Sequence, residues 1–491
     1  MKDFKKIILL QSAEIDKTEI LDVTYEAEGS VSGSDGIVYE KLPRFYRVRL
    51  CSRPGENSCI YTEVWLPKDW NSIFLGIGNG GMAGSISYGG LAKYVRQGYA
   101  VANTDLGTSR GRDSGIDNPD VWKDFGWRAT HIMTVAGKAL TRLLYGKKET
   151  ASYFVGGSTG GQQALSEAQR FPDDYDGIVA GVPANNRTLL HTYFLWNHVH
   201  LRPKGKGPLF SSAEIRMVTD FAVQYFQAVG DGVPGDDFIT FPEAGENVIA
   251  GFIAYLQKQH PEFCKEQLRA LYALYTGPVN PSTGERIYNG MPIGSEINGC
   301  GIEDCQQEES PHYYPFIWAF GKDYDGYEFD FDQDLTRLNA KLAKDLNANS
   351  PDLSAFEKHG GKIILYSGSA DPCVPFPDAM NYYDRIIEQM GGYEKAASFA
   401  RYFLFPGKDH GNSGKGTNAI WASTEGGGEL EALRLWREEG KAPDSLIAVS
   451  FYDQNPDAGI RFLRPVYPYG APAGKKKTMT CPPACSDYYL H

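Results

Sequence analysis

The stretch SYFVGGSTGGQQALSEAQRFP, residues 152–172, limits what this chain can fold into more than any other part of it. The run from Tyr153 to Val155 is typical of a buried strand, and the residues after Ser158 have the composition of a helix. Gly156 and Gly160 allow the backbone to turn sharply between the two. The pattern predicts a strand, a tight turn and a helix, with Ser158 at the turn, where a serine can act as a nucleophile.

A second serine, Ser109, has the same Gly-x-Ser-x-Gly spacing, and a motif this short arises by chance roughly 0.4 times in a chain so rich in glycine. A strand-like run precedes Ser109, but the polar segment RGRDSGIDNPD follows it instead of a helix. We therefore interpret Ser109 as a loop residue and Ser158 as the candidate nucleophile.

Strand-like and helical segments alternate along the first part of the chain. Strand-like runs occupy residues 20–66, followed by the buried strand NSIFLGIGNGG, the helix SYGGLAKYVRQG and the strand YAVANTD. The alternation predicts an α/β fold with a mostly parallel sheet and helices on both faces. A further helix is expected from Phe125 to Tyr145. Its predicted buried face contains four apolar residues: Ile132, Val135, Leu140 and Leu143.

The alternation stops near residue 190 and resumes at GKIILYSGSAD, which begins at Gly361. The sequence between these points is irregular and rich in aromatic residues. We predict one α/β core interrupted by an insertion. The expected segments are 1–189 for the first part of the core, 190–355 for the inserted domain and 356–491 for the second part of the core.

A serine hydroxyl needs a base to become nucleophilic, and the base needs a carboxylate to orient it. Of the nine histidines, His410 alone follows a late strand, in the glycine-bounded loop GKDHGNSG. Asp371 ends the preceding strand, KIILYSGSA, and is the predicted acid. Asp409 adjoins His410, but adjacent side chains on an extended loop usually diverge. We predict that Ser158, His410 and Asp371 act together, in the chain order serine, acid, histidine.

Two backbone N–H groups are expected to stabilise the oxyanion of a tetrahedral intermediate. The residue after the nucleophile, Thr159, is the first candidate. The second is Gly80 or Gly81, in the glycine cluster that follows the strand NSIFLGI. The alternative is that this cluster forms only a tight turn.

The net charge of −12 argues against a nucleic-acid or anionic-membrane partner. No apolar run approaches the length of a transmembrane helix. The apolar run from Ile7 to Leu10 is too short for the core of a signal peptide, which predicts a cytoplasmic protein. Secretion remains open if a signal peptide has been removed. The oligomeric state is left open by the sequence.

Six of the eight cysteines lie close together in pairs along the sequence: Cys51 and Cys59, Cys300 and Cys305, and Cys481 and Cys485. These spacings suit short disulfide loops in an oxidising compartment or reduced structural thiols in a reducing one. None has the C-x₂-C spacing of a zinc site. Cys264 and Cys373 have no neighbour in the sequence.

With these residues in hand, the sequence resembles the tannase and feruloyl esterase family of α/β-hydrolases. The resemblance rests on EVWLPKDWNSIFLGIGNGGMAG, FGWRATHIMT, YFVGGSTGGQQALSEAQRFPDDYDGIVAGVPANN, YSGSADPCVPFPDAMNYY and FPGKDHGNSG, which occur in the family's order. It implies an α/β-hydrolase fold with a lid domain at about residues 190–355, and Ser158, Asp371 and His410 as the catalytic triad. It further implies a small aromatic ester as substrate, hydrolysed through an acyl-enzyme without a cofactor, as with gallate or hydroxycinnamate esters.

The chain departs from the family at two glycines. Family members typically carry a disulfide-bonded cysteine pair at the positions of Gly157 and Gly411, beside the catalytic serine and histidine. The loss of both cysteines together fits a reducing compartment. It also predicts a more mobile His410 loop.

The resemblance further implies a calcium site in the lid, for which the chain retains only part of the ligand set. The candidate oxygen ligands are the side chains of Asp231, Asp236 and Asp237 and the carbonyls of Val233 and Ile239. Calcium prefers six or more oxygens, and the alternative is an acidic surface loop without a metal.

Aromatic residues of the insertion, with Tyr313 and Trp318 as the candidates, either stack on a phenolic ring or form the small core of the lid. Two other functions remain open. One is an esterase or acyltransferase for another small ester, and the other is a non-catalytic binding protein on the same scaffold.

Overall fold

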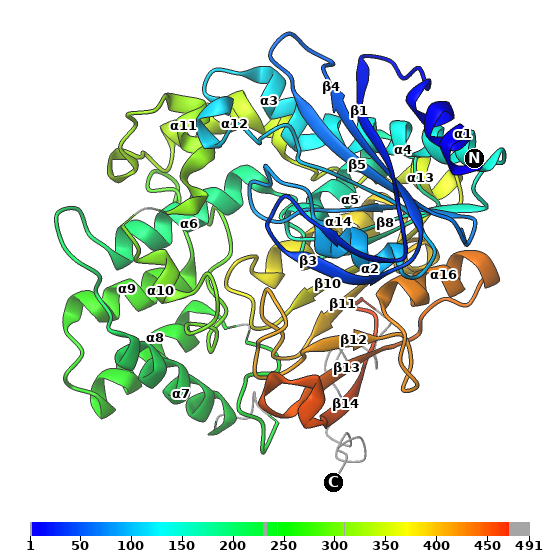
Figure 1. Cartoon of the computed structure of the whole chain (residues 1–491). Coiled ribbons are helices and arrows are strands. Elements are labelled where there is room, and N and C mark those ends of the chain that lie inside the picture. Colours follow the sequence, from blue (N-terminus) through cyan, green and yellow to red (C-terminus); the bar gives the residue numbers. More distant parts are fainter. Residues whose placement is uncertain (1, 229–232, 243, 309, 471–491) are drawn as a thin grey trace. The chain divides into compact units, whose positions relative to one another are not determined.

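Figure 1 shows the computed structural model of the chain, which describes residues 2–228, 233–242, 244–308 and 310–470. Its backbone contacts divide it into two compact units. Unit 1 contains Met1–Asn185, Ile317–Lys322 and Leu342–Ile363, and unit 2 contains Asn186–Phe316, Asp323–Lys341 and Ile364–His491.

Unit 1 is built around a twisted sheet in which neighbouring strands follow the order β1-β4-β5-β7-β6-β8-β9. The pairs β1/β4, β4/β5 and β5/β7 are antiparallel, whereas β6/β7, β6/β8 and β8/β9 are parallel. The parallel sheet expected from the sequence therefore begins at β6, and the earlier strands add an antiparallel section. The strands are β1 (Thr18–Glu26), β4 (Phe45–Ser52), β5 (Ile60–Pro67), β6 (Ile73–Ile77), β7 (Ala100–Thr104), β8 (Ala151–Gly157) and β9 (Gly177–Gly181). A separate hairpin pairs β2 (Gly29–Ser32) with β3 (Val38–Leu42).

Strands β6, β7 and β9 are buried at every residue, as strands covered by helices on both faces must be. Helices α4 and α5 pack on the parallel strands, and α2 packs on β7. The helices of unit 1 are α1 (Lys2–Gln11), α2 (Tyr88–Val95), α3 (Pro119–Lys123), α4 (Ala129–Tyr145), α5 (Thr159–Arg170) and α13 (Ser354–Lys358). A 3₁₀ turn, Arg112–Gly115, precedes α3, and a π-helical turn, Asp124–Arg128, joins α3 to α4.

The buried face of α4 differs from the one expected. Met133, Ala136 and Leu140 are buried, whereas Val135 is 46% exposed. All four residues of the expected face lie within α4, and the buried face of this helix also contains small and polar residues that an apolar pattern does not detect, among them Thr130, Thr134, Gly137 and Thr141. The helix was therefore predicted correctly, and its inward face was not.

Unit 2 contains a group of helices, visible in green in Figure 1: α6 (Arg187–Leu201), α7 (Ser212–Ala228), α8 (Glu246–Gln259), α9 (Lys265–Thr276) and α10 (Ile302–Cys305). It also contains β11 (Ala400–Phe405) beside β10, the antiparallel sheet β12-β13-β14, and three later helices. These elements are β12 (Ala419–Trp421), β13 (Leu446–Phe451), β14 (Ile460–Val466), α14 (Phe376–Gln389), α15 (Tyr393–Ala397) and α16 (Glu429–Glu439). Short 3₁₀ turns occupy Pro311–Tyr313, Gly326–Glu328, Tyr452–Gln454 and Pro456–Ala458.

Three elements contribute residues to both units: α11 (Tyr314–Phe320), α12 (Gln333–Leu346) and β10 (Lys362–Gly368). The units therefore do not coincide with the predicted segments. The predicted lid, residues 190–355, stays a prediction.

Three glycines bring the end of β6, the end of β8 and the start of α5 into backbone contact. A Cβ atom on Gly78 would lie 2.4 Å from the Cα of Gly160, and a Cβ on Gly156 would lie 2.4 Å from the carbonyl oxygen of Gly160. Backbone atoms cannot move aside as the end of a side chain can. These contacts therefore require glycine, and they fix where the turn at residue 158 lies relative to β6.

We expect Gly156→Ala to lower the free energy of unfolding by about 1–3 kcal/mol, because the added methyl group overlaps the backbone of α5. Gly157→Ala is the matched control. A Cβ there would find its nearest neighbour at 3.7 Å, so a change within about 0.5 kcal/mol is expected. Urea unfolding of both variants provides the measurement. Equal loss of stability in both would contradict this account of the turn.

Candidate active site

Ser158 lies between β8 and α5 with φ 59° and ψ −119°, a conformation that only a strongly constrained non-glycine residue adopts. Its N–H donates to the carbonyl of Gly181 at 3.0 Å. Its own carbonyl accepts from the N–H groups of Gln162 at 3.1 Å and Ala184 at 3.0 Å. Ser158 is half-buried, at the N-terminal end of the helix dipole, where negative charge is stabilised. This is the strand–turn–helix that the sequence predicted.

The glycine cluster after β6 contacts the start of α5. The hydroxyl of Thr159 donates to the carbonyl of Gly81 at 2.5 Å, and the N–H of Gly160 donates to the carbonyl of Asn79 at 2.8 Å. Gly81 has φ 55°, and no atom lies within 4 Å of where a Cβ on Gly80 would be. The structure therefore brings together the residues predicted to supply oxyanion donors, within unit 1.

Asn79 and Gln163 position this cluster, and neither was singled out from the sequence. The Gln163 side-chain oxygen accepts from the Asn79 N–H at 2.9 Å, and the Asn79 amide donates to the carbonyl of Thr104 at 2.8 Å. Both side chains are buried. An asparagine inside a glycine cluster at the end of a buried strand was the available signal.

In unit 2, the carboxylate of Asp371 holds His410. One oxygen, Oδ2, lies 2.8 Å from Nδ1 of His410, and the other, Oδ1, accepts from the N–H groups of Cys373 at 2.8 Å and Val374 at 3.0 Å. Asp371 is fully buried. A carboxylate can only accept, so His410 carries its hydrogen on Nδ1 and leaves Nε2 as the basic nitrogen. Asp409 instead accepts from the hydroxyl of Ser413 at 2.7 Å.

Burial of His410 opposes its protonation, but the adjacent Asp371 carboxylate outweighs this effect and raises the pKa of His410 above its ordinary value of 6.5. A histidine arranged in this way can accept a proton, and the adjacent carboxylate stabilises the imidazolium that forms.

The loop that carries His410 is held by internal hydrogen bonds. The ammonium group of Lys408, buried under the loop, bonds to the carbonyl of Gly411 and to the side-chain oxygen of Asn412. The amide of Asn418 donates to the carbonyls of Asn412 and Gly414 at 3.1 and 2.7 Å. These contacts restrain the loop without a disulfide. Its predicted mobility stays a prediction.

The two glycines at the positions of the family's cysteine pair are not required by local packing. A Cβ atom on Gly157 would meet its nearest neighbour at 3.7 Å, and one on Gly411 at 3.9 Å. Either position therefore has room for a larger side chain.

The described residues of the predicted calcium site do not fit a calcium ion. Asp236 forms two hydrogen bonds to the guanidinium of Arg464, at 2.7 and 2.6 Å, with both side chains buried. Asp237 pairs with Arg461 at 2.8 Å. A divalent cation at these carboxylates would face two arginines that already neutralise them.

The two backbone carbonyls of the predicted calcium site already accept hydrogen bonds within the protein. The carbonyl of Val233 accepts from the N–H of Asp236 at 3.1 Å, and the carbonyl of Ile239 accepts from the hydroxyl of Ser369 at 3.4 Å. Asp231 lies outside the described residues.

The two aromatic residues predicted to bind substrate have partners of their own. Trp318, in unit 1, is fully buried, donates to the carbonyl of Arg112 at 2.6 Å and packs edge-on against Phe125. Tyr313, in unit 2, is half-buried and donates to the carbonyl of Tyr324 at 2.6 Å. The contacts of Trp318 are those of a core residue, and we assign it no role in substrate binding.

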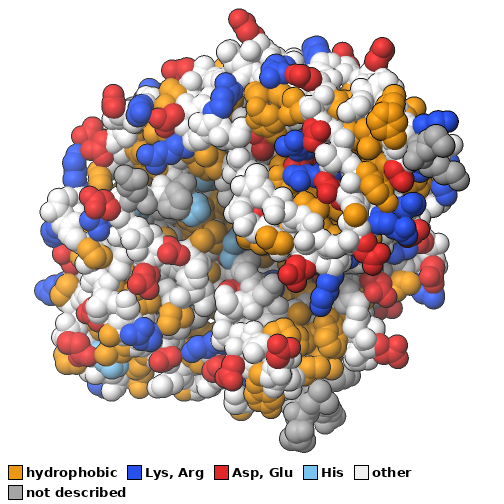
Figure 2. All heavy atoms as spheres, in the orientation of Figure 1, with side chains coloured by type: hydrophobic (Ala, Val, Ile, Leu, Met, Phe, Trp, Pro, Cys, Tyr) orange, Lys and Arg blue, Asp and Glu red, His pale blue; other side chains and the backbone are white. Residues whose placement is uncertain are grey.

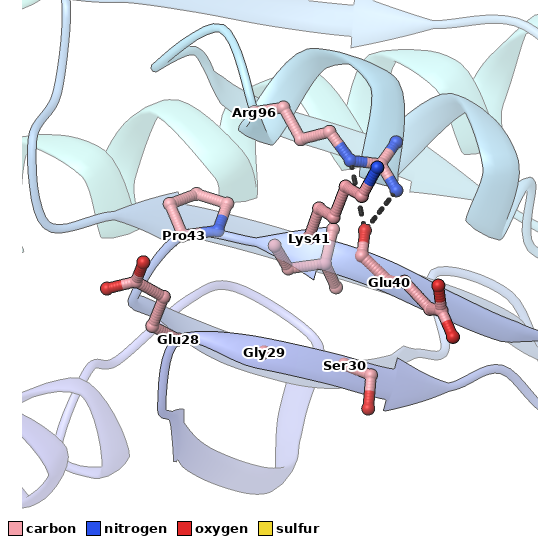
Figure 3. A pocket seen from close by; sticks show the side chains of 8 residues that line it. Glu28, Gly29, Ser30, Glu40, Lys41, Pro43 and Arg96 are labelled. Carbon is pink, nitrogen blue, oxygen red and sulfur yellow. Dashed lines mark hydrogen bonds between the residues drawn. The ribbon is translucent and has the colours of Figure 1, made fainter.

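A surface pocket of about 680 Å³ lies on the β2–β3 hairpin, away from Ser158 in the sequence (Figure 3). It is lined by Glu28, Gly29, Ser30, Glu40, Lys41, Leu42, Pro43 and Arg96. The guanidinium of Arg96 donates to the carbonyl of Glu40 at 3.2 and 2.5 Å. The pocket contains no histidine to activate Ser30, so it does not compete with Ser158.

The face drawn in Figure 2 shows no large patch of one charge. No helix among the described residues is long and apolar enough to cross a membrane. On the face drawn in Figure 2, acidic and basic side chains are interspersed, so the negative net charge is spread rather than gathered there.

The strained serine at the turn, and the histidine held by a buried aspartate, define the class of α/β-hydrolases that act through a serine. Comparison with known proteins identifies the family within this class. Residues 47–311 and 314–481 match the family model of tannase and feruloyl esterase, and the chain belongs to this family. It is therefore a carboxylic-ester hydrolase.

Two relatives and two solved structures illustrate the similarity. An uncharacterized esterase of Xanthomonas campestris is 31% identical over 94% of this chain and 87% of its own length. A probable feruloyl esterase B-2 of Aspergillus flavus is 30% identical over 85% of this chain and 82% of its own length. Feruloyl esterase B from Aspergillus oryzae superposes with a TM-score of 0.84 at 24% identity, over 97% of this chain and all of that one. Tannin acyl hydrolase from Aspergillus niger does so with a TM-score of 0.73 at 19% identity, over 94% of this chain and 91% of that one.

These findings confirm the α/β-hydrolase fold and the family that the sequence predicted. They also correct one expectation. The prediction of a cytoplasmic protein is wrong, because the feruloyl esterase and tannase relatives are secreted, extracellular enzymes. A reducing compartment therefore no longer explains the absence of the cysteine pair at Gly157 and Gly411.

We expect kcat/KM to decrease as the pH is lowered, with the midpoint of the decrease above pH 6.5. Protonated His410 cannot accept a proton, and the pKa of His410 is raised above 6.5.

Asp371→Asn should lower kcat by roughly 10⁴-fold, since an amide cannot orient the imidazole as a carboxylate does. Asp409→Asn, the matched control beside His410, should stay within a few-fold of wild type. Kinetics across pH 5–9 provide the measurement, and a greater loss in Asp409→Asn than in Asp371→Asn would reverse the assignment.

Removal of divalent cations with EDTA should leave Tm unchanged, because arginines neutralise Asp236 and Asp237. Arg464→Met should lower the free energy of unfolding by roughly 3–5 kcal/mol, because it leaves the buried Asp236 carboxylate without its partner. Arg434→Met, which removes an exposed pair with Glu438, should cost about 0.5 kcal/mol or less. A Tm that falls in EDTA and returns with calcium would show that the protein binds the metal after all.

Proposed function

We propose that this enzyme hydrolyses esters of phenolic acids, such as gallate or hydroxycinnamate esters, through an acyl-enzyme on Ser158. The observation that carries the proposal is the hydrogen bond of His410 to the buried Asp371, in a chain whose relatives are named feruloyl esterases and tannin acyl hydrolase. The strained conformation of Ser158 supports the same role. No cofactor enters the chemistry.

In the proposed reaction, the hydroxyl of Ser158 attacks the ester carbonyl while Nε2 of His410 takes the hydroxyl proton. The Asp371 carboxylate stabilises the imidazolium that forms. The N–H of Thr159 and an N–H of Gly80 or Gly81 donate to the oxyanion. The alcohol then leaves with the proton from His410, and the acyl group remains on Ser158.

Deacylation repeats these steps with water. His410 takes a proton from water, hydroxide attacks the acyl carbonyl, and the phenolic acid leaves as Ser158 regains its proton. We place the selection of the acyl group in the segment 190–355. Tyr313 remains a candidate for contact with the phenolic ring.

The test compares hydrolysis of methyl gallate, methyl ferulate, methyl p-coumarate and p-nitrophenyl acetate by wild type and two serine variants. Ser158→Ala should lower kcat by roughly 10⁴-fold or more, because the nucleophile is absent. Ser109→Ala, the matched control, removes the exposed serine of the other Gly-x-Ser-x-Gly motif and should stay within a few-fold of wild type.

The outcomes separate the two parts of the proposal. Cleavage of a phenolic ester that Ser158→Ala loses supports both the nucleophile and the substrate class. Cleavage of the p-nitrophenyl ester alone would keep Ser158 and exclude phenolic acids. Full activity of Ser158→Ala on any ester would exclude Ser158 as the nucleophile.

A further inference from the structure

Two cysteines that are far apart in the sequence meet beside the catalytic acid. The sulfurs of Cys300 and Cys373 lie 2.6 Å apart, although 73 positions separate the residues. Cys373 is buried and Cys300 is half-buried. The proposed reaction uses neither thiol.

The segments that carry the two thiols are joined by their own hydrogen bonds. The N–H of Cys373 donates to Oδ1 of Asp371 at 2.8 Å, so this cysteine is part of the loop that holds the acid. Asn298, two residues before Cys300, donates from its amide to the carbonyl of Ala370 at 2.7 Å. The backbone therefore already holds the loop before α10 against the acid loop, which is the condition for a cross-link without rearrangement.

The surroundings of Cys300 favour its thiolate. The contact with the Cys373 sulfur, together with the nearby imidazoles of His312 and His410, lowers the pKa of Cys300 to about 6. Interaction with Cys300, together with burial, raises the pKa of Cys373. One sulfur is thus the nucleophile near neutral pH, and the other is the buried thiol that resolves a mixed disulfide.

We propose that Cys300 and Cys373 form a redox pair that closes a disulfide between the loop before α10 and the loop of the catalytic acid. The Cys300 thiolate attacks a small-molecule disulfide and displaces one thiolate from it. Cys373, on losing its proton, then attacks the Cys300 sulfur and displaces the second thiolate. Two electrons pass from the cysteines to the small disulfide, which leaves as two thiols.

His312 makes a metal site the competing interpretation, because a ligand atom from each of Cys300, His312 and Cys373 lies within 4.8 Å of the others. Two thiolates on one zinc ion lie about 3.8 Å apart, given Zn–S bonds of about 2.3 Å at the tetrahedral angle. The separation of 2.6 Å between these sulfurs is much shorter than a shared zinc ion would give. The imidazole of His312 is also stacked on Phe194, with ring centroids 3.9 Å apart.

A disulfide at this place would restrain the acid loop directly. It would close a long loop of chain, the case in which a cross-link removes the most freedom from the unfolded state. The relatives' extracellular environment is one in which such a bond persists. Only its value for catalysis rests on the proposed function, because the cross-link itself forms whether or not Ser158 reacts.

The test uses the purified full-length chain, equilibrated with reduced and oxidised glutathione or with dithiothreitol. Free thiols are alkylated, the protein is digested without reduction, and linked peptides are identified by mass spectrometry. We expect a peptide that joins Cys300 to Cys373 in the oxidised sample and not in the reduced one. Tm should be about 5 °C higher in the oxidised protein.

Cys300→Ser should abolish both the linked peptide and the difference in Tm. Cys373→Ala provides a second route if one variant folds poorly. Cys264→Ser is the matched control, because Cys264 is exposed in the same unit, and it should keep both effects. Ser158→Ala should also keep both, which separates failure of the cross-link from failure of the proposed hydrolysis.

Three results would overturn the proposal. One is the absence of a Cys300–Cys373 peptide at every glutathione ratio. The second is a link from Cys300 to Cys305 instead, whose buried sulfur lies 3.3 Å from the carbonyl of Cys300. The third is protection of Cys300 and Cys373 from alkylation by added zinc without any cross-link, which would identify a metal site.

Discussion

The hydrogen bond between the buried carboxylate of Asp371 and His410 is the interaction on which the candidate site in unit 2 depends. A charge removed from water is costly unless hydrogen bonds and a partner of opposite charge replace the lost solvation. Asp371 receives two backbone N–H groups on one oxygen and His410 on the other. The loop must therefore wrap tightly around the carboxylate, and this wrapping both orients the histidine and brings Cys373 to the position where it meets Cys300.

The same principle operates at Asp236 in unit 2, whose buried carboxylate is matched by a cation of the chain itself. Arg464 neutralises Asp236 through two hydrogen bonds, with both side chains excluded from solvent. Lys408 lies under the histidine loop and bonds to its backbone, while burial lowers the pKa of its ammonium group. Burial of the Lys408 charge is unfavourable by itself. Lys408 therefore contributes to the structure through its hydrogen bonds to the histidine loop. Arg464 therefore binds a carboxylate for which the family resemblance suggested a metal ion.

The parts of the site that sequence reasoning predicted are those that local backbone rules determine. The turn at Ser158 follows from glycines placed where the backbones of β6, β8 and α5 touch, and no distant residue is needed to recognise it. Asp371 and His410 follow from their places after late strands. The inward face of α4 could not be found in this way, because its buried residues include Thr130, Thr134 and Thr141, which an apolar pattern does not detect.

The remaining features depend on contacts between residues far apart in the sequence. Arg464 meets Asp236 across 228 positions, and Cys300 meets Cys373 across 73. Nothing near Asp236 in the sequence distinguishes a carboxylate bound to calcium from one bound to arginine, since both are acidic residues in a turn. Sequence spacing singled out Cys305 as the neighbour of Cys300, whereas the sulfur of Cys373 lies 2.6 Å from that of Cys300 in the structure.

The absence of the family's cysteine pair and the presence of the Cys300–Cys373 contact are best understood together. The family's pair, as the resemblance implies, joins the neighbours of the serine and the histidine, and here both positions are glycines with space around them. The proposed cross-link instead restrains the acid, one step further from the reacting atoms. A bond at that place leaves the histidine loop to its hydrogen bonds and fixes the carboxylate that orients it. Because the hydrogen bond to Asp371 sets the position of the His410 imidazole, restraint of Asp371 can replace restraint of His410.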